Sequence, residues 1–426
     1  MTRRSILMMG ASMPLLAACG APAPRESAPS QSVAPVTLQF WTNNVANVAY
    51  AKEFEAKYPN VKMDAASIGD YDVLAEKALT NVAAGTPPNI SILGQRHGIT
   101  QLSDGGALRD VEALLTKQER ADFYPQFIEK FTYKGALRAL PFQSSVSTLY
   151  WNKEHFKAVG LDPEKPPTTW DEHLEMARKL VKHQPNGQTN PWGHVMVSGA
   201  WYFYAMVWQN GGEVVDKQGQ PTFNKQPGIE AALLWQDWVH KYRVAPGGKR
   251  DEAAREFRAG KASLMQQTQV GRVALDKEGT IKYGVAFLPK KQRYAVSIGG
   301  NAIGVFKVPA AAGKNGRDME NASWQFVNWL TGTEMGTRIV EETGYLPLRR
   351  STTQHEKLRA FFKASPHAEV PVQQLQHLQA HPIQRSDEQM WVGLDKVLTT
   401  LETDATANPR PLLDALAAEI KQLLSR

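Results

Sequence analysis

The chain has 426 residues, of which 42% are hydrophobic and 21% charged, and its formal net charge is +7. This length suffices for two or three domains, and the composition is that of an ordinary soluble globular protein, which excludes a chain that is disordered throughout. Acidic and basic residues are interspersed and no long Lys/Arg run occurs. The excess positive charge therefore predicts a solvated surface and no nucleic-acid partner.

The first 19 residues are typical of a processed export segment. Arg3 and Arg4 precede an apolar stretch from Ile6 to Ala18, which is too short to span a bilayer as a mature helix. It ends in Leu-Ala-Ala-Cys, which resembles a bacterial lipobox and predicts that Cys19 is lipidated as the first mature residue. The paired arginines also resemble a twin-arginine signal, although Ile6 stands at the usual aromatic position, so both this route and general secretion stay open.

Cys19 is the only cysteine in the chain. If it is lipidated, the folded body contains no thiol. This excludes disulfide bonds, catalysis by a thiolate and metal sites with Cys ligands. We expect no metal site and no cofactor. Residues 20–35 hold four prolines among Ala, Ser and Gln. Such a composition cannot bury a core, so this segment is interpreted as a tether that holds the body off a membrane.

The next segment alternates strand and helix patterns. Strands are predicted at 36–42, 61–65 and 89–93, and amphipathic helices at 50–58 and 71–84 lie between them. This βαβαβ order predicts a parallel sheet with right-handed crossovers.

Residues 140–153 follow a predicted hairpin at 131–140. β-Branched and aromatic residues give this stretch strand character, but Gln143, Ser144 and Ser145 interrupt it with short polar side chains. A strand with polar residues at a break can present hydroxyls and backbone amides to a cleft. An ordinary surface kink between two strands is the alternative.

Helical patterns dominate the remainder. A helix after 168 has a capping box at Thr169 and Glu172, aromatic residues crowd positions 192–208, and further helices are predicted at 229–242 and at the C-terminus. Two more breaks interrupt the pattern. One is the glycine pair within the strand at 297–305, and the other is Thr-Gly-Tyr-Leu-Pro at 343–347. No internal repeat is present.

Together these motifs resemble the family 1 extracellular solute-binding proteins of ABC importers. The similarity covers nearly the whole mature chain in the family's order, and it is greatest to the glycerol-3-phosphate and glycerophosphodiester binders. The motifs that carry it are Pro-Phe-Gln-Ser-Ser at 141–145, Leu-Tyr-Trp-Asn-Lys at 149–153, Gly-Leu-Asp-Pro at 160–163, Pro-Pro-Thr-Thr-Trp at 166–170, Phe-Arg-Ala-Gly-Lys-Ala at 257–262, Ile-Gly-Gly at 298–300 and Thr-Gly-Tyr-Leu-Pro at 343–347.

The resemblance implies an α/β, two-lobed periplasmic-binding-protein fold of type II, like that of maltose-binding protein. Three crossovers would join the lobes around a central ligand cleft, and the three breaks would be hinges. The implied division is a signal peptide at 1–19, a tether at 20–35, an N-terminal lobe at 36–143 and 302–342, a C-terminal lobe at 147–297 and 347–426, and hinges near 144–146, 298–301 and 343–346.

The resemblance also implies the ligand-binding residues. Ser144 is included because it is the neighbour of Ser145 in the polar break. Two positions depart from the family pattern: Gln95 stands where the family has a Glu, and Trp391 stands where it has a late Arg. The candidate set is Tyr71, Gln95, Ser144, Ser145, Trp170, Thr268, Gly300, Tyr345 and Trp391.

Each of three candidates also has a purely structural interpretation. Trp170 can be a packed helix residue, Gly300 only a hinge, and Tyr345 part of the core. The two departures would favour a neutral sugar or a choline-bearing phosphodiester, because an indole attracts a quaternary ammonium by about 0.5–2 kcal/mol. Arg96, His97 and Arg385 could still supply positive charge.

The predicted function is that of a periplasmic solute-binding lipoprotein. It would act as a lipid-anchored monomer on the outer face of the cytoplasmic membrane and would deliver glycerol-3-phosphate or a glycerophosphodiester to an ABC permease. A mono- to oligosaccharide is the alternative ligand.

A secreted hydrolase is a remote alternative. The chain has no His-Glu-x-x-His, Gly-x-Ser-x-Gly or phosphate-binding loop. Its adjacent acidic pairs, Asp171-Glu172 and Glu341-Glu342, point in different directions on a helix and favour a solvated surface over a glycosidase site. We therefore expect no enzymatic activity.

Overall fold

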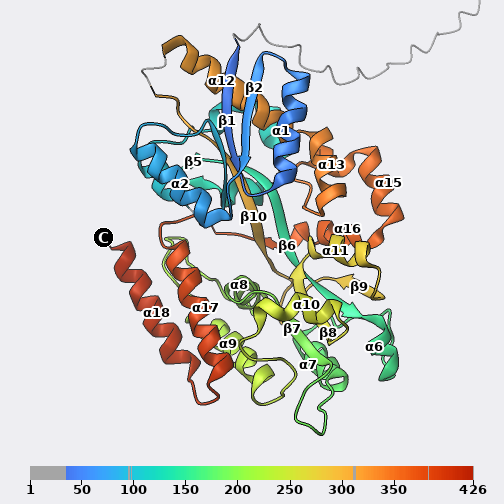
Figure 1. Cartoon of the computed structure of the whole chain (residues 1–426). Coiled ribbons are helices and arrows are strands. Elements are labelled where there is room, and N and C mark those ends of the chain that lie inside the picture. Colours follow the sequence, from blue (N-terminus) through green and yellow to red (C-terminus); the bar gives the residue numbers. More distant parts are fainter. Residues whose placement is uncertain (1–34, 95, 97, 310–312, 382, 426) are drawn as a thin grey trace, which may run out of the picture.

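The computed structural model describes residues 35–94, 96, 98–309, 313–381 and 383–425. The export segment with Cys19, nearly all of the tether, Gln95 and His97 lie outside the described residues. Within them, nine strands form one sheet, whose main path is β2-β1-β3-β10-β6-β8-β7 (Figure 1). The strands of this sheet are β1 (Val36–Thr42), β2 (Val61–Ser67), β3 (Ile90–Gly94), β6 (Leu140–Asn152), β7 (Trp192–Met196), β8 (Ala262–Thr268), β9 (Tyr283–Ala286), β10 (Val296–Val305) and β11 (Leu378–Gln379).

The helices cover this sheet in two groups, one above and one below the long strands in Figure 1. They are α1 (Val45–Lys57), α2 (Tyr71–Ala83), α3 (Ile99–Asp104), α4 (Lys117–Asp122), α5 (Pro125–Lys130), α6 (Lys153–Ala158), α7 (Trp170–Leu180), α8 (Ala200–Gln209), α9 (Gln226–Val239), α10 (Ala253–Arg258), α11 (Gly271–Glu278), α12 (Gly313–Leu330), α13 (Thr333–Thr343), α14 (Arg350–Gln354), α15 (Glu356–Ala364), α16 (Pro366–Gln373), α17 (Asp387–Thr403) and α18 (Pro409–Leu424).

The N-terminal βαβαβ segment folds as its pattern predicts. β1 pairs in parallel with both β2 and β3. Tyr50, Ala51 and Phe54 form the buried face of α1, as their helical spacing requires. The predicted short hairpin is also present, with β4 (Thr132–Tyr133) and β5 (Ala136–Leu137) on either side of the turn.

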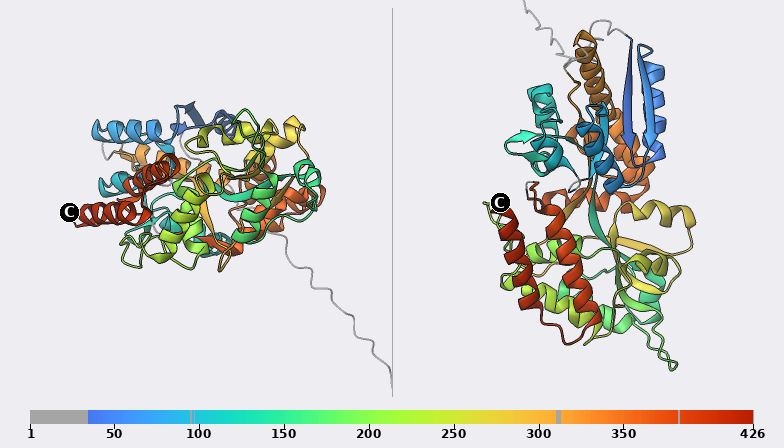
Figure 2. Two further views of the ribbon diagram at one scale, coloured as in Figure 1. Left: turned by 90° about the horizontal axis from the view of Figure 1, so that it is seen from below. Right: turned by 60° about the vertical axis from the view of Figure 1, so that its left-hand side comes forward.

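Two long strands, β6 and β10, run through both lobes (Figure 2, right). The first part of β6 pairs with β10, and residues 147–151 pair with β8 in the C-terminal lobe. The polar residues at 143–145 do not break β6, contrary to our expectation. Instead the register shifts between Gly299 and Asn301 of β10, and Gln143 has a φ of 36°. A bulge of this kind takes up an extra residue while the ladder continues on both sides.

The third predicted break is a helix end and not part of a strand. α13 ends at Thr343, and Gly344, at φ 76°, occupies the left-handed position that commonly caps a helix. The chain then stays beside the N-terminal lobe: the Leu348 carbonyl accepts from the Tyr124 N–H at 3.1 Å, and the Ser351 N–H donates to Asp122 at 2.8 Å. The C-terminal lobe therefore does not begin at 347 as expected, because α14 and α15 pack with α13.

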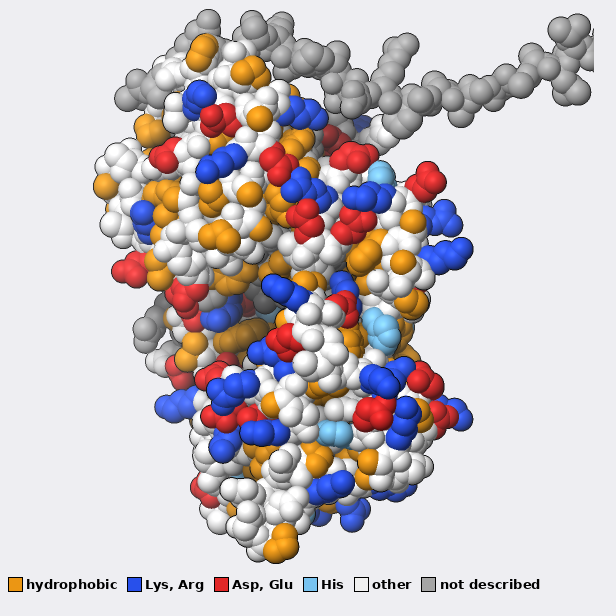
Figure 3. All heavy atoms as spheres, turned by 45° about the vertical axis from the view of Figure 1, so that its right-hand side comes forward, with side chains coloured by type: hydrophobic (Ala, Val, Ile, Leu, Met, Phe, Trp, Pro, Cys, Tyr) orange, Lys and Arg blue, Asp and Glu red, His pale blue; other side chains and the backbone are white. Residues whose placement is uncertain are grey.

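The surface carries both signs of charge. On the face shown in Figure 3, Lys and Arg side chains alternate with Asp and Glu over both lobes. Across the described residues, no helix is long and apolar enough to cross a membrane. The same residues contain no cluster of three His, Cys, Asp or Glu side chains that could hold a metal ion.

Candidate functional site

A cavity of about 220 Å³ lies where the long strands pass between the lobes. The N-terminal lobe contributes the first residue of α2 and Arg96, which follows β3. The C-terminal lobe contributes the end of β8, the start of α8 and one residue of α17. The lining residues are Tyr71, Arg96, Ser145, Ser198, Trp201, Thr268, Gly299, Gly300 and Trp391.

The structure brings five of the nine candidate residues together in this cavity. They are Tyr71, Ser145, Thr268, Gly300 and Trp391. Ser144 lies directly behind it, fully buried, and its carbonyl accepts from the Leu346 N–H at 2.9 Å.

Tyr345 stands behind Tyr71, with which its hydroxyl forms a hydrogen bond. Burial raises the pKa of the Tyr345 phenol, and the contact with Tyr71 adds to this shift. The phenol therefore stays protonated and can support Tyr71 from outside the cavity.

Trp170, one of the nine candidate ligand-binding residues, does not line the cavity. As the first residue of α7 its side chain is buried, and its indole N–H donates to the Gln209 side chain at 2.9 Å. Lys291 lies over the same ring at 5.5 Å. The indole is thus held inside the C-terminal lobe.

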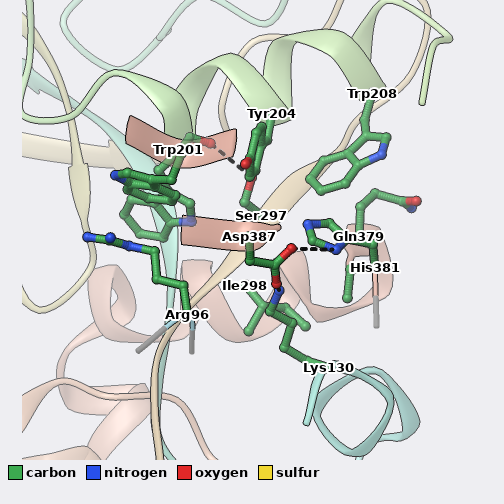
Figure 4. A pocket seen from close by; sticks show the side chains of 12 residues that line it. Arg96, Lys130, Trp201, Tyr204, Trp208, Ser297, Ile298, Gln379, His381 and Asp387 are labelled. Atoms are coloured by element: carbon green, nitrogen blue, oxygen red, sulfur yellow. Dashed lines mark hydrogen bonds and ion pairs between the residues drawn. The ribbon is translucent and has the colours of Figure 1, made fainter. Parts of the chain in front are cut away.

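Trp201 and Trp391 supply the indoles of the cavity instead. Trp201 belongs to a row with Tyr204 and Trp208, spaced by three and four residues on α8, and all three point from this helix toward a second, small cavity of about 30 Å³ (Figure 4). Arg96, Trp201 and Trp391 line both cavities. The sequence shows this spacing within its aromatic-rich stretch, so it was the available signal for Trp201.

The start of α8 is fixed from outside the cavity by α17. The Ala200 N–H donates to the Asp395 carboxylate at 2.9 Å, an anion at a helix N-terminus. A Cβ at Gly199 would overlap the ends of the Asp395 and Arg250 side chains, so a larger residue here would require both of them to move. This arrangement holds Ser198 and Trp201 against the cavity.

Gly300 packs closely against the neighbouring crossover. Its φ is 98°, and a Cβ would overlap the Gln143 carbonyl oxygen and lie 2.8 Å from the Ser144 Cα. Both facts require glycine at this position. Gly300 is therefore at once a wall of the cavity and the contact between two crossovers.

Among the described residues that line the cavity, Arg96 is the one cation, and it is already engaged. The Arg96 guanidinium lies 4.7 Å above the Trp391 ring and forms an ion pair with Glu388. The indole face that we expected to attract a quaternary ammonium therefore holds an arginine. Of the described residues, no Asp or Glu lines this cavity.

Residues 49–370 match the family model described as bacterial extracellular solute-binding protein. The chain belongs to this family. As a solute-binding protein of an ABC importer, it binds a small molecule and delivers it to a permease, which confirms that part of the sequence prediction.

Curated relatives of this solute-binding protein include sn-glycerol-3-phosphate-binding periplasmic proteins. UgpB of Brucella abortus is 25% identical over 403 residues, which is 89% of each chain. UgpB of Rhizobium meliloti is 24% identical over 402 residues, covering 88% of this chain and 90% of the relative.

Solved structures show the same fold. UgpB from Mycobacterium tuberculosis, in complex with glycerophosphocholine, has a TM-score of 0.79 at 20% identity and covers 92% of this chain and 99% of its own. Maltose-bound MalE3 of T. maritima has a TM-score of 0.76 at 21% identity, covering 91% and 99%. The predicted two-lobed fold of the maltose-binding-protein type is confirmed.

A buried charged pair joins the lobes beside the smaller cavity of this solute-binding protein. The Lys130 ammonium of α5 lies 3.8 Å from the Asp387 carboxylate at the start of α17, and both side chains are less than 10% exposed. His381 Nδ1 is 3.6 Å from the same carboxylate (Figure 4). Burial lowers the pKa of Lys130, and the charge of Asp387 opposes that shift.

Proposed function

We propose that this solute-binding protein captures a phosphate-bearing polyol, either glycerol-3-phosphate or a glycerophosphodiester. The observation that carries the proposal is the polarity of the described cavity wall: Arg96 and two indoles line it, and no carboxylate does. A wall of this kind suits a ligand rich in hydrogen-bond acceptors. Phosphate oxygens are such acceptors.

Arg96 and Trp201 are donor-only groups that line the cavity. The Arg96 guanidinium carries five N–H donors, so it can bind a phosphate oxygen while Glu388 remains its partner. Trp201 is 8% exposed, and its indole N–H is buried without a hydrogen-bond partner among the described residues. A buried donor costs free energy until it is paired, which favours a ligand oxygen at this point.

Hydroxyl side chains of the cavity offer acceptors for a glycerol hydroxyl. The Thr268 hydroxyl donates to the Gln269 side chain at 3.2 Å and accepts from the Val270 N–H at 3.4 Å, so its remaining lone pair is what it can offer to a ligand. Ser145 and Ser198 can donate or accept. A ligand that carries both a phosphate and hydroxyls can therefore pair with the donors and with the acceptors of this cavity.

A neutral mono- to oligosaccharide is the second candidate. It is supported by the row of Trp201, Tyr204 and Trp208 along one face of α8, because sugar C–H surfaces pack on aromatic rings. The lack of a lining carboxylate among the described residues argues against it, since sugar hydroxyls need acceptors.

Titration calorimetry separates the two candidates. We expect sn-glycero-3-phosphocholine or glycerol-3-phosphate to bind at least about tenfold more tightly than glycerol or maltose, because unpaired buried donors penalise a ligand without phosphate. Arg96→Gln should remove most of this preference. Arg178→Gln is the matched control, because Arg178 also lies over an aromatic ring, that of Tyr242, outside the cavity. Tight binding of maltose without binding of either phosphate compound would overturn the proposal.

We further propose that the protein is a monomeric lipoprotein anchored through Cys19, and that it returns its ligand unchanged. The lipobox supports the first point. Membrane fractionation of Cys19→Ser should find the protein released, and retention equal to that of the wild type contradicts the anchor. Chromatography of ligand after incubation with the protein tests the second point, since any product would indicate catalysis.

A further inference from the structure

Gln269 lies between the end of β8 and the start of α11, directly after Thr268, which lines the cavity. It is 2% exposed, and it extends the pairing of β8 with β6 by one residue. Its backbone N–H donates to the Val146 carbonyl at 3.3 Å, and its side-chain oxygen accepts from the Val146 N–H at 2.9 Å. The side-chain amide thus takes the place of a backbone carbonyl where the strand ends.

A backbone donor fixes the orientation of this amide. An amide has donors on one end and an acceptor on the other, whereas a backbone N–H can only donate. Turning the Gln269 amide over would place its NH2 group against the Val146 N–H, so its oxygen must face Val146. Because Val146 contributes a main-chain group, no joint turn of neighbouring side chains can reverse this contact.

The same amide oxygen decides where the hydrogen of the Thr268 hydroxyl lies. Thr268 Oγ1 and Gln269 Oε1 are 3.2 Å apart, and of these two oxygens only the hydroxyl has a hydrogen to donate. The Val270 N–H, again a backbone donor, donates to the hydroxyl oxygen at 3.4 Å. Turning the Thr268 hydrogen toward a ligand would leave two oxygens facing each other with no hydrogen between them, at the cost of a hydrogen bond.

We propose that Gln269 is a positioning residue for ligand recognition, which keeps the Thr268 hydroxyl an acceptor toward a ligand hydroxyl. The inference rests on the proposed binding function of the cavity and adds a specificity to it. At Thr268 the cavity selects a ligand group that can donate, which is a hydroxyl, over a carbonyl or an ether oxygen, which can only accept.

The main chain of Thr268 is held by groups other than the Gln269 side chain. Its N–H donates to the Gln267 side chain at 2.8 Å, and its carbonyl accepts from the Tyr150 hydroxyl at 3.0 Å. Replacing the Gln269 amide should therefore release the hydroxyl hydrogen and leave Thr268 in place. The arrangement has a cost, because Gln269 Nε2 is buried without a hydrogen-bond partner among the described residues. Such groups are rare in folded proteins, and the use of the amide oxygen provides a reason for this one.

Calorimetry with acceptor-only analogues of glycerol-3-phosphate tests the inference. Dihydroxyacetone phosphate has a carbonyl at C2, and 1-O-methyl-glycerol-3-phosphate has an ether at C1. At least one of them should bind the wild type about tenfold more weakly than glycerol-3-phosphate does. In Gln269→Met this penalty should fall below about threefold, because Thr268 can then turn its hydrogen toward the ligand. A purely structural role would lower all affinities and leave the penalty unchanged. An unchanged penalty overturns the inference, as does the absence of any penalty in the wild type.

Three further variants isolate the oxygen of Gln269. Gln269→Glu keeps an acceptor at the same position, so the penalty should persist even where the added charge weakens phosphate binding overall. Thr268→Val should abolish the penalty, and a penalty that survives there overturns the inference even when Gln269→Met does not fold. Gln266→Met is the matched control, because Gln266 is a similarly buried amide of β8 whose side-chain oxygen has no hydrogen-bond partner in the described part of the chain. It should keep the wild-type penalty.

A measurement without ligand keeps this inference apart from the ligand proposal. Neutron diffraction from a crystal of the deuterated, ligand-free protein locates the Thr268 hydroxyl deuterium directly. It should lie on the line to the Gln269 oxygen, and a deuterium that points into the cavity overturns the inference. If the wild type binds maltose and no phosphate compound, the proposed ligand is wrong, and the neutron map still decides the role of Gln269.

Discussion

The two lobes touch at both ends of the cavity, and the two contacts differ in kind. At the crossovers the contact is made by backbone: Gly300 packs against the Gln143 carbonyl, and the Leu346 N–H donates to the Ser144 carbonyl at 2.9 Å. At the other end the contact is made by charged side chains, which are Lys130 with Asp387, Arg96 with Glu388, and Asp104 with Arg385. We refer to these three pairs as the charged contact.

The difference indicates which end can move. Backbone groups of continuous strands cannot separate without breaking the sheet ladder. Charged side chains can separate into water, where each ion regains its hydration and the net change is small. The contacts therefore favour rotation about the crossovers with opening at the charged contact, which is how hinged binding proteins close on a ligand.

The largest effect should come from filling the space at Gly300. Gly300→Ala would place a methyl group on the Gln143 carbonyl at a φ of 98°, combining overpacking with a strained backbone. We expect a loss of about 3–5 kcal/mol in the free energy of unfolding, or no folded protein. Urea denaturation measures it.

Gly260→Ala is the matched control for this substitution. Gly260 also has a positive φ, 69°, but a Cβ there would meet nothing within 4 Å. Only the backbone strain should remain, at about 1–2 kcal/mol. Equal losses at the two glycines would show that the close approach between crossovers does not matter.

A smaller effect is expected from breaking the buried pair of the charged contact. Asp387→Asn leaves the Lys130 ammonium buried without a compensating charge whenever the lobes are together. Removing one partner of a buried ion pair is costly, so the population of the open form should rise. Ligand affinity should therefore fall roughly 30-fold, which is about 2 kcal/mol. Small-angle scattering should show a larger radius of gyration for the liganded variant than for the liganded wild type.

Arg385→Gln is the control within the same contact. Arg385 is 62% exposed, and its pairing with Asp104 is largely screened by water. We expect less than about a threefold change in affinity. Lys130→Met combined with Asp387→Leu should recover most of the lost affinity, because no buried charge then remains. Similar losses in Asp387→Asn and Arg385→Gln would contradict a role for the buried pair.

Local sequence predicted the elements of the fold well but not how distant segments meet. The N-terminal strands and helices follow from hydrophobic period and capping. The polar run at 143–145 correctly marked a special point in β6, yet the bulge depends on Gly300, more than 150 residues away. Likewise, nothing near residue 347 shows that Arg349 lies over Phe123 and keeps this segment on the N-terminal lobe.

The candidate site shows the same limit. Five of the nine candidate residues chosen by motif resemblance line one cavity. The resemblance did not include Trp201, although the spacing of the aromatic residues on α8 is visible in the sequence. It did include Trp170. The capping box at Thr169 and Glu172 shows where α7 begins, but it does not show that the Trp170 indole is buried. The pairing of Arg96 with Glu388 joins residues 292 positions apart, which no local pattern can reveal.

Acid provides a last test, and it should act inside the C-terminal lobe. His173 and His194 are buried there, with His173 Nε2 3.0 Å from His194 Nδ1. Burial lowers the pKa of His173 to about 4, and it lowers that of His194 as well. The lobe interior should therefore respond to acid through this pair, whereas the crossovers should not.

The sign of the effect follows from the two states. The unfolded chain takes up protons near the ordinary histidine pKa of about 6.5, before the folded chain does, so stability is complete above this pH and falls between it and pH 4. His173 alone should lower the free energy of unfolding by about 2 kcal/mol at pH 5. Urea denaturation at pH 7.5 and 5 should show this difference in the wild type and a smaller one in His173→Gln. The exposed His183→Gln is the control that should keep the full difference. If His173→Gln also keeps it, the acid sensitivity arises elsewhere, and the charged contact becomes the next place to test.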